Sequence, residues 1–464
     1  RGGSAGAPFQ MIQRLLLWAD DRFGTGTFVH HALKKAFPDH WSFMLGEINM
    51  YAFLILLATG TFLALWFVPG HTQVVYEGPY ALLRGQRMSE AYDSVLHICF
   101  AVNAGLLIRQ IHHWAADIFV AGIVVHMGRI FFTGAFRNPR ELNWIIGVLL
   151  LFAAMFEGFT GYSMPDDLLS GMGLRIAVSI LQSVPFIGTW ATFFLTGGVW
   201  PTEILIERLF ITHVFIMPAL ITLGITVHLM ILWRQKHTQF PGPRRTEENV
   251  VGAPLYPLYT FKSLALQFGV IAVCCLLGAF VQINPVWLWG PYKTWTAISP
   301  AQPDWYIGWL EGALRIGPRW AIHFPGHMIP SPFWPGFLLP FVIMIGLFAY
   351  PWIDKFLSKD YAQHHLLNRP RDVPVRTAAG VGFFVFMFGL FAAGSDDVQA
   401  AYTHLPLNDL VWFYRFFCLL APFAAFWITY TIAWDLKKKG GTHQAERVRL
   451  RRKPEGGYEE EPVC

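Results

Sequence analysis

Long apolar runs separated by polar segments dominate the chain between residues 44 and 434. Eight of these runs are long enough for a helix to cross about 30 Å of hydrocarbon. They lie at residues 44–68, 107–132, 143–163, 207–233, 263–283, 333–352, 376–394 and 407–434. The pattern predicts an all-α membrane protein with eight transmembrane helices.

Composition supports this fold class. Of the 464 residues, 54% are hydrophobic and only 14% are charged, against about 25% charged in an average soluble domain. The five cysteines form no CxxC motif, so the sequence gives no support for a zinc ribbon or a covalently attached c-type haem. The net charge of +5 comes from Lys and Arg near the ends of the apolar runs, which suits anionic membrane lipids. No nucleic-acid motif is present, and no nucleic-acid partner is expected.

The distribution of Lys and Arg predicts the orientation. Most of the 35 Lys and Arg residues lie before the first run, after the last run, or in every second connection between runs. Under the positive-inside rule, these segments and both termini face the cytoplasm. The protein is expected to lie in the plasma membrane. The predicted domains are a cytoplasmic segment (1–43), a first four-helix domain (44–235), a second four-helix domain (236–434) with a long outer loop (284–332), and a charged tail (435–464). The tail is expected to be disordered.

Two of the first four helices carry histidine pairs. His112 and His126 are 14 residues apart, about 40° short of four helical turns. His213 and His228 are 15 residues apart, about 60° past four turns. Each pair shares one face of its helix, so two such helices can clamp two planar macrocycles by bis-imidazole ligation. The spacing predicts two non-covalent b-type haems with these four histidines as iron ligands.

His113 and the ordinary roles of membrane histidines offer alternatives. His113 is 13 residues from His126, about 140° short of four turns, so it should point away from the shared face. Histidines in membranes can also simply bridge helices through hydrogen bonds. Four histidines in two matched pairs favour the haem interpretation, because polar groups in lipid are costly.

Glycines repeat the histidine spacing on the two other helices of the first domain, and arginines flank the histidines. The glycines form two pairs, each 14 residues apart: Gly46 and Gly60, Gly147 and Gly161. Packing explains many membrane glycines, but this repetition indicates flat places where a porphyrin approaches the backbone.

Arg109 and Arg208 lie near the outer histidines, and Arg129 near an inner one. Each could be a snorkelling residue, although the placement favours pairing with haem propionates.

Six short motifs mark the chain between about residues 41 and 434. They are Arg109-Gln-Ile-His112, His126-Met-Gly-Arg129, Gly161-Tyr-Ser-Met-Pro165, Val184-Pro-Phe-Ile-Gly188, Arg208 with His213, and Pro303-Asp-Trp-Tyr306. Together they resemble cytochrome b, the haem and quinone subunit of respiratory cytochrome bc complexes, in the form found in high-GC Gram-positive bacteria. Two features depart from the usual pattern: the His213–His228 spacing of 15, where mitochondrial members have 14, and Asp304, where most members carry Glu.

The resemblance implies a subunit of a quinol:cytochrome c reductase that contributes to proton-motive force. The pair His112 and His213 would hold a low-potential haem near the outside. The pair His126 and His228 would hold a high-potential haem near the cytoplasm. Quinol, expected to be menaquinol, is oxidised at an outer site, and quinone is reduced at an inner site. The expected partners are a Rieske iron–sulfur subunit, a cytochrome c-type subunit, a second copy of the chain in a homodimer, and a terminal oxidase in a supercomplex.

The resemblance also implies an outer quinol site around the Pro303–Tyr306 tetrapeptide. Asp304 is expected to accept a quinol proton, with Tyr306 as a second catalytic residue. The residues expected to line the same cavity are Pro303, Trp305, Tyr162 and Gly173. Glu311, seven residues after Asp304, is a candidate second proton relay. On residue type alone, Asp304 could instead be a turn-capping residue, and Glu311 a solvated acid.

The sequence leaves the inner quinone site open. Where the family has a His and an Asp at the ends of the fourth and fifth helices, this chain has Trp233 and Ser263. His237 and Lys262 lie nearby, but each is equally explained as an interfacial cation. Two other classes of protein remain alternatives. A dihaem anchor of another dehydrogenase would share the histidines but has no evident use for the tetrapeptide, and a transporter or scaffold would bind no haem.

Overall fold

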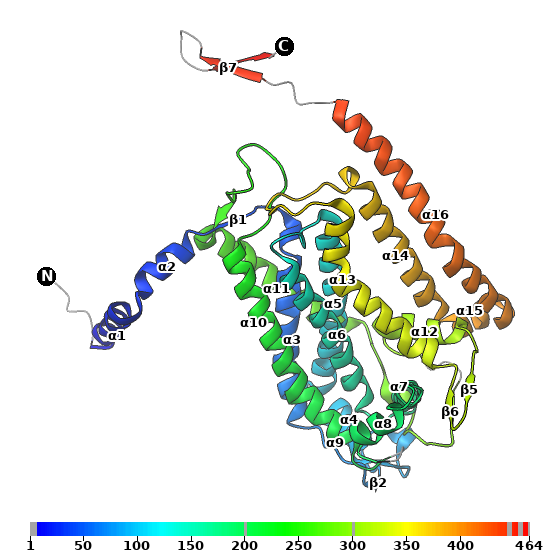
Figure 1. The fold of residues 1–464 in the computed structure, drawn as a ribbon. Helices are drawn as coiled ribbons and strands as arrows, with labels where there is room; N and C mark the ends of the chain where they lie inside the picture. Colours follow the sequence, from blue (N-terminus) through cyan, green and yellow to red (C-terminus); the bar gives the residue numbers. More distant parts are fainter. Residues whose placement is uncertain (1–6, 199–201, 299–301, 443–447, 453–457, 463–464) are drawn as a thin grey trace.

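The computed structural model describes residues 7–198, 202–298, 302–442, 448–452 and 458–462, which form a bundle of long helices (Figure 1). Within the described residues, eight helices are long and apolar enough to cross a membrane. They are α3 (Leu45–Ala64), α5 (Gly105–Thr133), α6 (Glu141–Ser163), α9 continued by α10 (Leu205–Gln235), α11 (Thr260–Phe280), α13 (Leu339–Ser358), α14 (Pro374–Ala393) and α16 (Leu407–Thr442). All eight predicted spans are confirmed, with end points that shift by a few residues.

The number of crossings is even, so α3 begins and α16 ends at the same end of the bundle, called here the termini face (Figure 1). The connections at the other end, the opposite face, carry five short α-helices in their described parts. These are α4 (Glu90–Phe100), α7 (Leu168–Gln182), α8 (Gly188–Thr196), α12 (Trp305–Ile316) and α15 (Asp396–Thr403). The arrangement agrees with the predicted alternation of connections, while the cytoplasmic location of the termini face stays a prediction.

Short antiparallel strand pairs lie in the connections. The pairs are β1 (Ala36–Phe37) with β4 (Ala253–Pro254), β2 (Gln73–Val75) with β3 (Arg87–Ser89), and β5 (Ile322–Phe324) with β6 (His327–Ile329). The first pair is at the termini face and fastens the N-terminal segment to the connection between α10 and α11. The other two pairs are at the opposite face.

The two ends of the chain extend away from the bundle. The N-terminal helices α1 (Ala7–Phe23) and α2 (Thr25–Leu33) project sideways from it (Figure 1). After α16, β7 (Val448–Arg452) pairs with β8 (Tyr458–Pro462) in an antiparallel hairpin. The charge pattern of the sequence predicts disorder for this segment. Residues 1–6, 299–301 and the remaining parts of the predicted tail lie outside the described residues.

A π-helical turn, Thr212–Ile216, interrupts the helix formed by α9 (Leu205–Ile211) and α10 (Met217–Gln235). Such a turn holds about one residue more than an α-helical turn. Pro218 follows it and has no N–H to bond to the preceding turn, which favours the irregularity. The extra residue absorbs the 15-residue spacing of His213 and His228, which a regular helix would leave about 60° apart.

An apolar core fills the middle of the four helices that carry the histidines and glycines. Its buried side chains include Phe53, Phe119, Val120, Ala154 and Ile221, which lie midway between the two histidine or glycine positions of their helices, and Val148 beside Gly147. Because lipid is as apolar as these side chains, close packing is what holds membrane helices together. The core therefore fixes the helices and separates the two histidine levels with an apolar layer.

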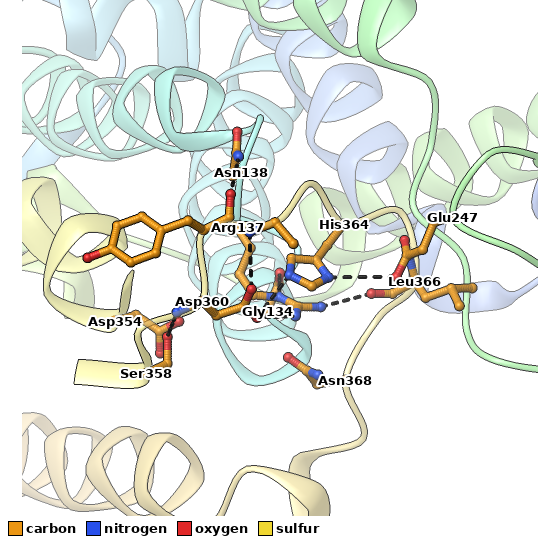
Figure 2. A network of polar contacts seen from close by, with 12 residues as sticks. Gly134, Arg137, Asn138, Glu247, Asp354, Ser358, Asp360, His364, Leu366 and Asn368 are labelled. Atoms are coloured by element: carbon orange, nitrogen blue, oxygen red, sulfur yellow. Dashed lines mark hydrogen bonds and ion pairs between the residues drawn. The ribbon is translucent and has the colours of Figure 1, made fainter. Parts of the chain in front are cut away.

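A polar network joins the three connections at the termini face (Figure 2). Arg137, after α5, donates a hydrogen bond of 2.8 Å to the carbonyl oxygen of Leu366. Glu247, after α10, accepts one of 2.8 Å from the backbone N–H of Leu366. His364 Nε2 lies 2.9 Å from Asp360 Oδ2 in the connection after α13. The network holds the ends of both histidine-bearing helices in one arrangement.

Candidate functional site

The outer histidine pair comes together near the opposite face. The rings of His112 on α5 and His213 in the π-helical turn have centroids 6.2 Å apart and planes inclined at 72°. Nδ1 of His112 lies 2.9 Å from Thr59 Oγ1, and Nδ1 of His213 lies 2.9 Å from the carbonyl oxygen of Glu157. These contacts fix each ring through Nδ1. They leave Nε2 available as a metal ligand, the usual arrangement of ligating histidines.

The spacing of the pair fits a shared metal ion. Imidazole nitrogens bind metals at about 2 Å, so two rings on one ion have centroids roughly 6 Å apart. The pair lines one cavity together with Arg109. Its lining is largely apolar with a few polar side chains, as in sites that bind cofactors. The residues present therefore fit a bis-histidine haem.

Each of the four predicted glycines lies against one of the four histidines. The distances from an ideal Cβ to the nearest ring atom are 2.4 Å for Gly161 and His213, 3.2 Å for Gly60 and His112, 3.4 Å for Gly46 and His126, and 4.0 Å for Gly147 and His228. The sequence pattern predicts room for a porphyrin at these positions. In the structure Gly161 makes room for the imidazole ring itself, because a methyl group there would overlap His213, whereas a methyl group at residue 147 would make an ordinary contact with His228.

The inner histidine pair, His126 and His228, lies near the termini face. The Nδ1 atoms of both rings are buried, with no hydrogen-bond partner among the described residues. Arg129, one turn from His126, holds its guanidinium 4.2 Å from the centroid of the Phe43 ring. Its Nε and Nη2 atoms are buried and find no partner in the described part of the chain. Unpaired cationic N–H groups beside a histidine suit the carboxylates of a haem.

The two arginines near the outer pair differ in position. Arg109 lines the outer cavity and donates from Nη1 to the carbonyl oxygen of Asn284 at 3.1 Å. Arg208 donates to the carbonyl oxygens of Phe194 and Leu195 at the end of α8, and it is not one of the residues lining that cavity. The structure brings Arg109 to the site, whereas Arg208 caps α8.

Asp304 stands at the start of α12, but its side chain does not cap that helix. Its Oδ1 lies 3.0 Å from Nε2 of His113, and its Oδ2 accepts a hydrogen bond of 2.9 Å from the Tyr306 hydroxyl. Asp304, Tyr306 and Tyr162 line the same cavity as the outer histidine pair. Trp305 is 38% exposed and meets the Tyr306 ring edge-on. The side chain therefore faces the cavity and does not serve as a turn cap.

His113 was not predicted to belong to this site. Helix geometry places it off the ligand face, and the structure agrees, because it is His112 that forms the ring contact with His213. The contact of His113 with Asp304 joins residues 191 positions apart. The sequence offers one signal for a role of His113 in the site: it is a second histidine directly after His112, and it points away from the ligand face.

Three other residues predicted for the outer quinol site, Pro303, Gly173 and Glu311, line a second cavity, which Asp304 does not line. Trp305 lines neither of the two cavities. Glu311 Oε1 accepts a hydrogen bond of 3.0 Å from Arg315 Nε, so the acid is ion-paired and not merely solvated. Burial raises the pKa of Glu311, and the Arg315 cation opposes that rise. The two predicted proton acceptors thus serve different cavities along α12.

Arg315 was also missed by the sequence reasoning. Besides Glu311, it contacts Asp396 at 2.6 Å and Asp397 at 3.0 Å, both at the start of α15. The available signal was its position four residues after Glu311 on a helix, where opposite charges pair. The two ion pairs with Asp396 and Asp397 fasten α12, and with it the tetrapeptide, to α15, and the pair with Glu311 lies within α12.

The candidates for the inner quinone site do not converge on one cavity. Lys262 forms an ion pair with Asp39 at 2.6 Å, in which the two side chains are 40% and 65% exposed. The His237 ring packs against Phe37 at 4.5 Å. Trp233 is partly exposed. None of these contacts by itself defines a quinone site.

Comparison with known proteins places these features in one family. The family model for cytochrome b (N-terminal)/b6/petB matches residues 117–291. The cytochrome b subunit of the cytochrome bc1 complex from Mycobacterium leprae is 48% identical over 443 residues, which cover 95% of this chain and 80% of that protein. The chain belongs to the cytochrome b subunits of cytochrome bc1 complexes. The subunit from Streptomyces coelicolor is 45% identical, covering 96% of this chain and 82% of that protein.

Further matches agree with this assignment. The cytochrome b subunit from Corynebacterium diphtheriae is 46% identical, covering 90% of this chain and 77% of that protein. The resemblance to the form of high-GC Gram-positive bacteria is thereby confirmed. A chain of a solved structure named "Hyperthermophilic respiratory Complex III" matches with a TM-score of 0.66 and 21% identity, over 90% of this chain and 99% of that one, which bears on the fold. Family membership and eight apolar helices make this cytochrome b a multi-pass membrane protein of the respiratory chain, and imply that it binds haem b and quinone.

Proposed function

We propose that this cytochrome b oxidises quinol beside the His112–His213 pair and delivers electrons across the membrane to a quinone site at the termini face. The position of Asp304 carries the proposal, because its carboxylate and the outer histidine pair line one cavity. Oxidation of a quinol releases two protons and two electrons. A proton acceptor beside an electron acceptor is what that reaction needs.

Two b-type haems are proposed, one at each histidine level. The ligand pairs are His112 with His213 and His126 with His228. When bound, the haems supply one-electron carriers near the two faces of the membrane. Thr59 and the Glu157 carbonyl group orient the outer rings through Nδ1. Arg109 and Arg129 offer N–H groups to the propionates, a role for which the contacts of Arg208 give no support.

Asp304 is the proposed acceptor of the first quinol proton. Contacts with His113 and Tyr306 hold its two oxygens in place, so the carboxylate is oriented before the quinol arrives. Glu311, in the neighbouring cavity with Pro303 and Gly173, is the proposed second relay. With the termini face in the cytoplasm, moving one electron inward against 100 mV would conserve about 2.3 kcal/mol.

The proposed partners follow from the fate of the two electrons. One crosses this subunit, and the other goes to a Rieske iron–sulfur subunit and a cytochrome c-type subunit. The relatives' printed names, which assign them to the cytochrome bc1 complex, support such an assembly. A homodimer, a supercomplex with a terminal oxidase, and menaquinone as the substrate are also proposed. Mass spectrometry of the complex purified in mild detergent tests all of these.

Substitution of Asp304 tests the proposed chemistry. Asp304→Asn should lower steady-state quinol oxidation about 100-fold, the low end of general acid–base effects, and leave the haem spectrum unchanged. Asp304→Glu should retain much more activity, because it restores a carboxylate. Glu77→Gln, a change of an exposed acid before α4, is the control. Wild-type turnover of the Asn variant would show that Asp304 accepts no proton, and Glu311 would be the next residue to test.

A further inference from the structure

Carboxyl and hydroxyl side chains form a cluster between α3 and α11, close to the termini face. Glu47, in the first turn of α3, accepts a hydrogen bond of 2.5 Å from Ser263 Oγ on one oxygen. Its other oxygen accepts a hydrogen bond from the Tyr259 hydroxyl. The Tyr51 hydroxyl bonds to Ser263 Oγ in turn. Both oxygens of the carboxylate therefore contact groups that can pass on a proton.

The cluster lies at the level of the inner histidine pair. Gly46, next to Glu47 in the chain, is the residue whose Cβ would approach His126 to 3.4 Å. Tyr51 and Tyr259 are each 7% exposed, so their hydroxyl groups are shielded from bulk solvent. An ionisable group in a membrane-spanning helix is costly and usually has a function.

Exposed charges lie close to the cluster along the chain, at the termini face. Lys262, which precedes Ser263, pairs with Asp39, and both side chains are well exposed. The Tyr259 ring packs against Phe37, the residue two positions before Asp39, at 4.5 Å. The exposed ion pair is thus next in the chain to Ser263, whose hydroxyl group contacts the carboxylate.

We propose that Glu47 is the proton-transfer carboxylate for quinone reduction at the termini face, and that Tyr259 and Ser263 resupply it. This inference rests on the proposed function, because it requires a quinone to be reduced at that face. The sequence left the site open because Ser263 stands where the family has an acid. In the fold, an acid reaches Ser263 from α3, a helix more than 200 residues earlier.

The step balances as follows in atoms and electrons. A quinone takes up two electrons, which derive from quinol oxidised at the opposite face, and two protons. For each proton the O–H bond of the Glu47 carboxyl group breaks and an O–H bond forms on an oxygen of the reduced quinone. The carboxylate then takes a proton from the Tyr259 or Ser263 hydroxyl, which regains one from the solvent side.

Rapid-mixing spectroscopy of the intact purified complex tests this role. The b haems are first reduced with menadiol in the presence of excess oxidised cytochrome c, and their reoxidation by menadione is then measured. Glu47→Gln should slow reoxidation about 100-fold, with haem content and reduction rate unchanged. Glu47→Asp should recover most of the rate. The matched control is Glu141→Gln, a first-turn carboxylate of α6 at the same face, paired with Lys355 at 3.7 Å.

Reoxidation of the Glu47→Gln variant at the wild-type rate would overturn the proposal. Equal losses in the Gln and Asp variants would also overturn it, because the cluster would then only hold α3 against α11. If the Gln variant fails to assemble, the Tyr259→Phe/Ser263→Ala double variant decides. It keeps the carboxylate and removes its donors, so slow reoxidation supports the proposal and a normal rate refutes it. Failure of the proposed function would look different, since menadiol would not reduce the wild-type haems.

Discussion

The close approach of Gly161 to His213 allows a quantitative test of how the helices hold the imidazole rings. A Cβ at residue 161 would lie 2.4 Å from Cε1, 2.9 Å from Nε2 and 3.0 Å from Nδ1 of His213. Non-bonded carbon atoms are comfortable at about 3.5–4 Å. The same substitution at Gly147 meets the His228 ring at 4.0 Å, an ordinary contact. The two glycines thus provide a matched pair on one helix.

The His213 ring has little freedom to give way. Its Nδ1 is 2.9 Å from the carbonyl oxygen of Glu157 and 3.2 Å from the carboxylate of the same residue. Overpacking of a well-packed site typically costs about 1–3 kcal/mol. If this cost falls on haem binding, affinity for the outer haem drops roughly 5- to 150-fold. Gly161→Ala should therefore lose much of that haem, and Gly147→Ala should keep both.

Haem per chain, measured as pyridine haemochrome on the purified complex, gives the answer. Reduced-minus-oxidised spectra of the same samples identify which haem is affected. The expected values approach one haem per chain for Gly161→Ala and two for Gly147→Ala. Equal haem contents, or a greater loss at residue 147, would refute the reasoning from the ring contacts.

Two further substitutions test other parts of the structure. His113→Ala should retain both haems, because the ring lies off the ligand face. It should slow quinol oxidation roughly tenfold, because the contact with Asp304 is lost. Loss of a haem would mean that the ligand is His113. Although burial raises it, hydrogen bonds from the backbone N–H groups of His365 and Leu366 hold the pKa of Glu247 below its usual value of 4.5. The charged carboxylate therefore stabilises the fold above about pH 4.5, and the contribution disappears as the pH falls below that value. Glu247→Gln should lower the free energy of unfolding at pH 7 by less than about 1 kcal/mol at this exposed position, which thermal unfolding detects as a slightly lower midpoint. The fall of that midpoint below pH 4.5 should become flatter, and an unaltered pH profile would contradict this.

Features that depend on local pattern could be predicted from the sequence. Membrane spans follow from apolar length, because a fixed hydrocarbon thickness sets the number of residues needed. The facing of the histidines follows from the regular rotation of a helix. The His213–His228 pair shows the limit of that geometry. Its spacing predicts an offset of about 60° in a regular helix, but the π-helical turn at His213 holds an extra residue.

Features that depend on contacts between distant segments could not be predicted. No local pattern joins Asp304 to His113, or Glu47 to Ser263, because each contact exists only once the helices have packed. The sequence places Arg208 near the outer histidine level. It gives no sign that carbonyl oxygens at the end of α8 compete for the guanidinium group of this residue. Side-chain direction is decided by such neighbours.

Haem stoichiometry in histidine variants tests the central claim most directly, namely that four histidines hold two haems, one at each face. The purified wild-type complex should contain two b-type haems per chain by pyridine haemochrome. Each of the single variants His112→Ala, His213→Ala, His126→Ala and His228→Ala should contain one, because one imidazole cannot hold six-coordinate low-spin iron. The His112→Ala/His126→Ala double variant should contain none. Two haems in any of the single variants would contradict the account.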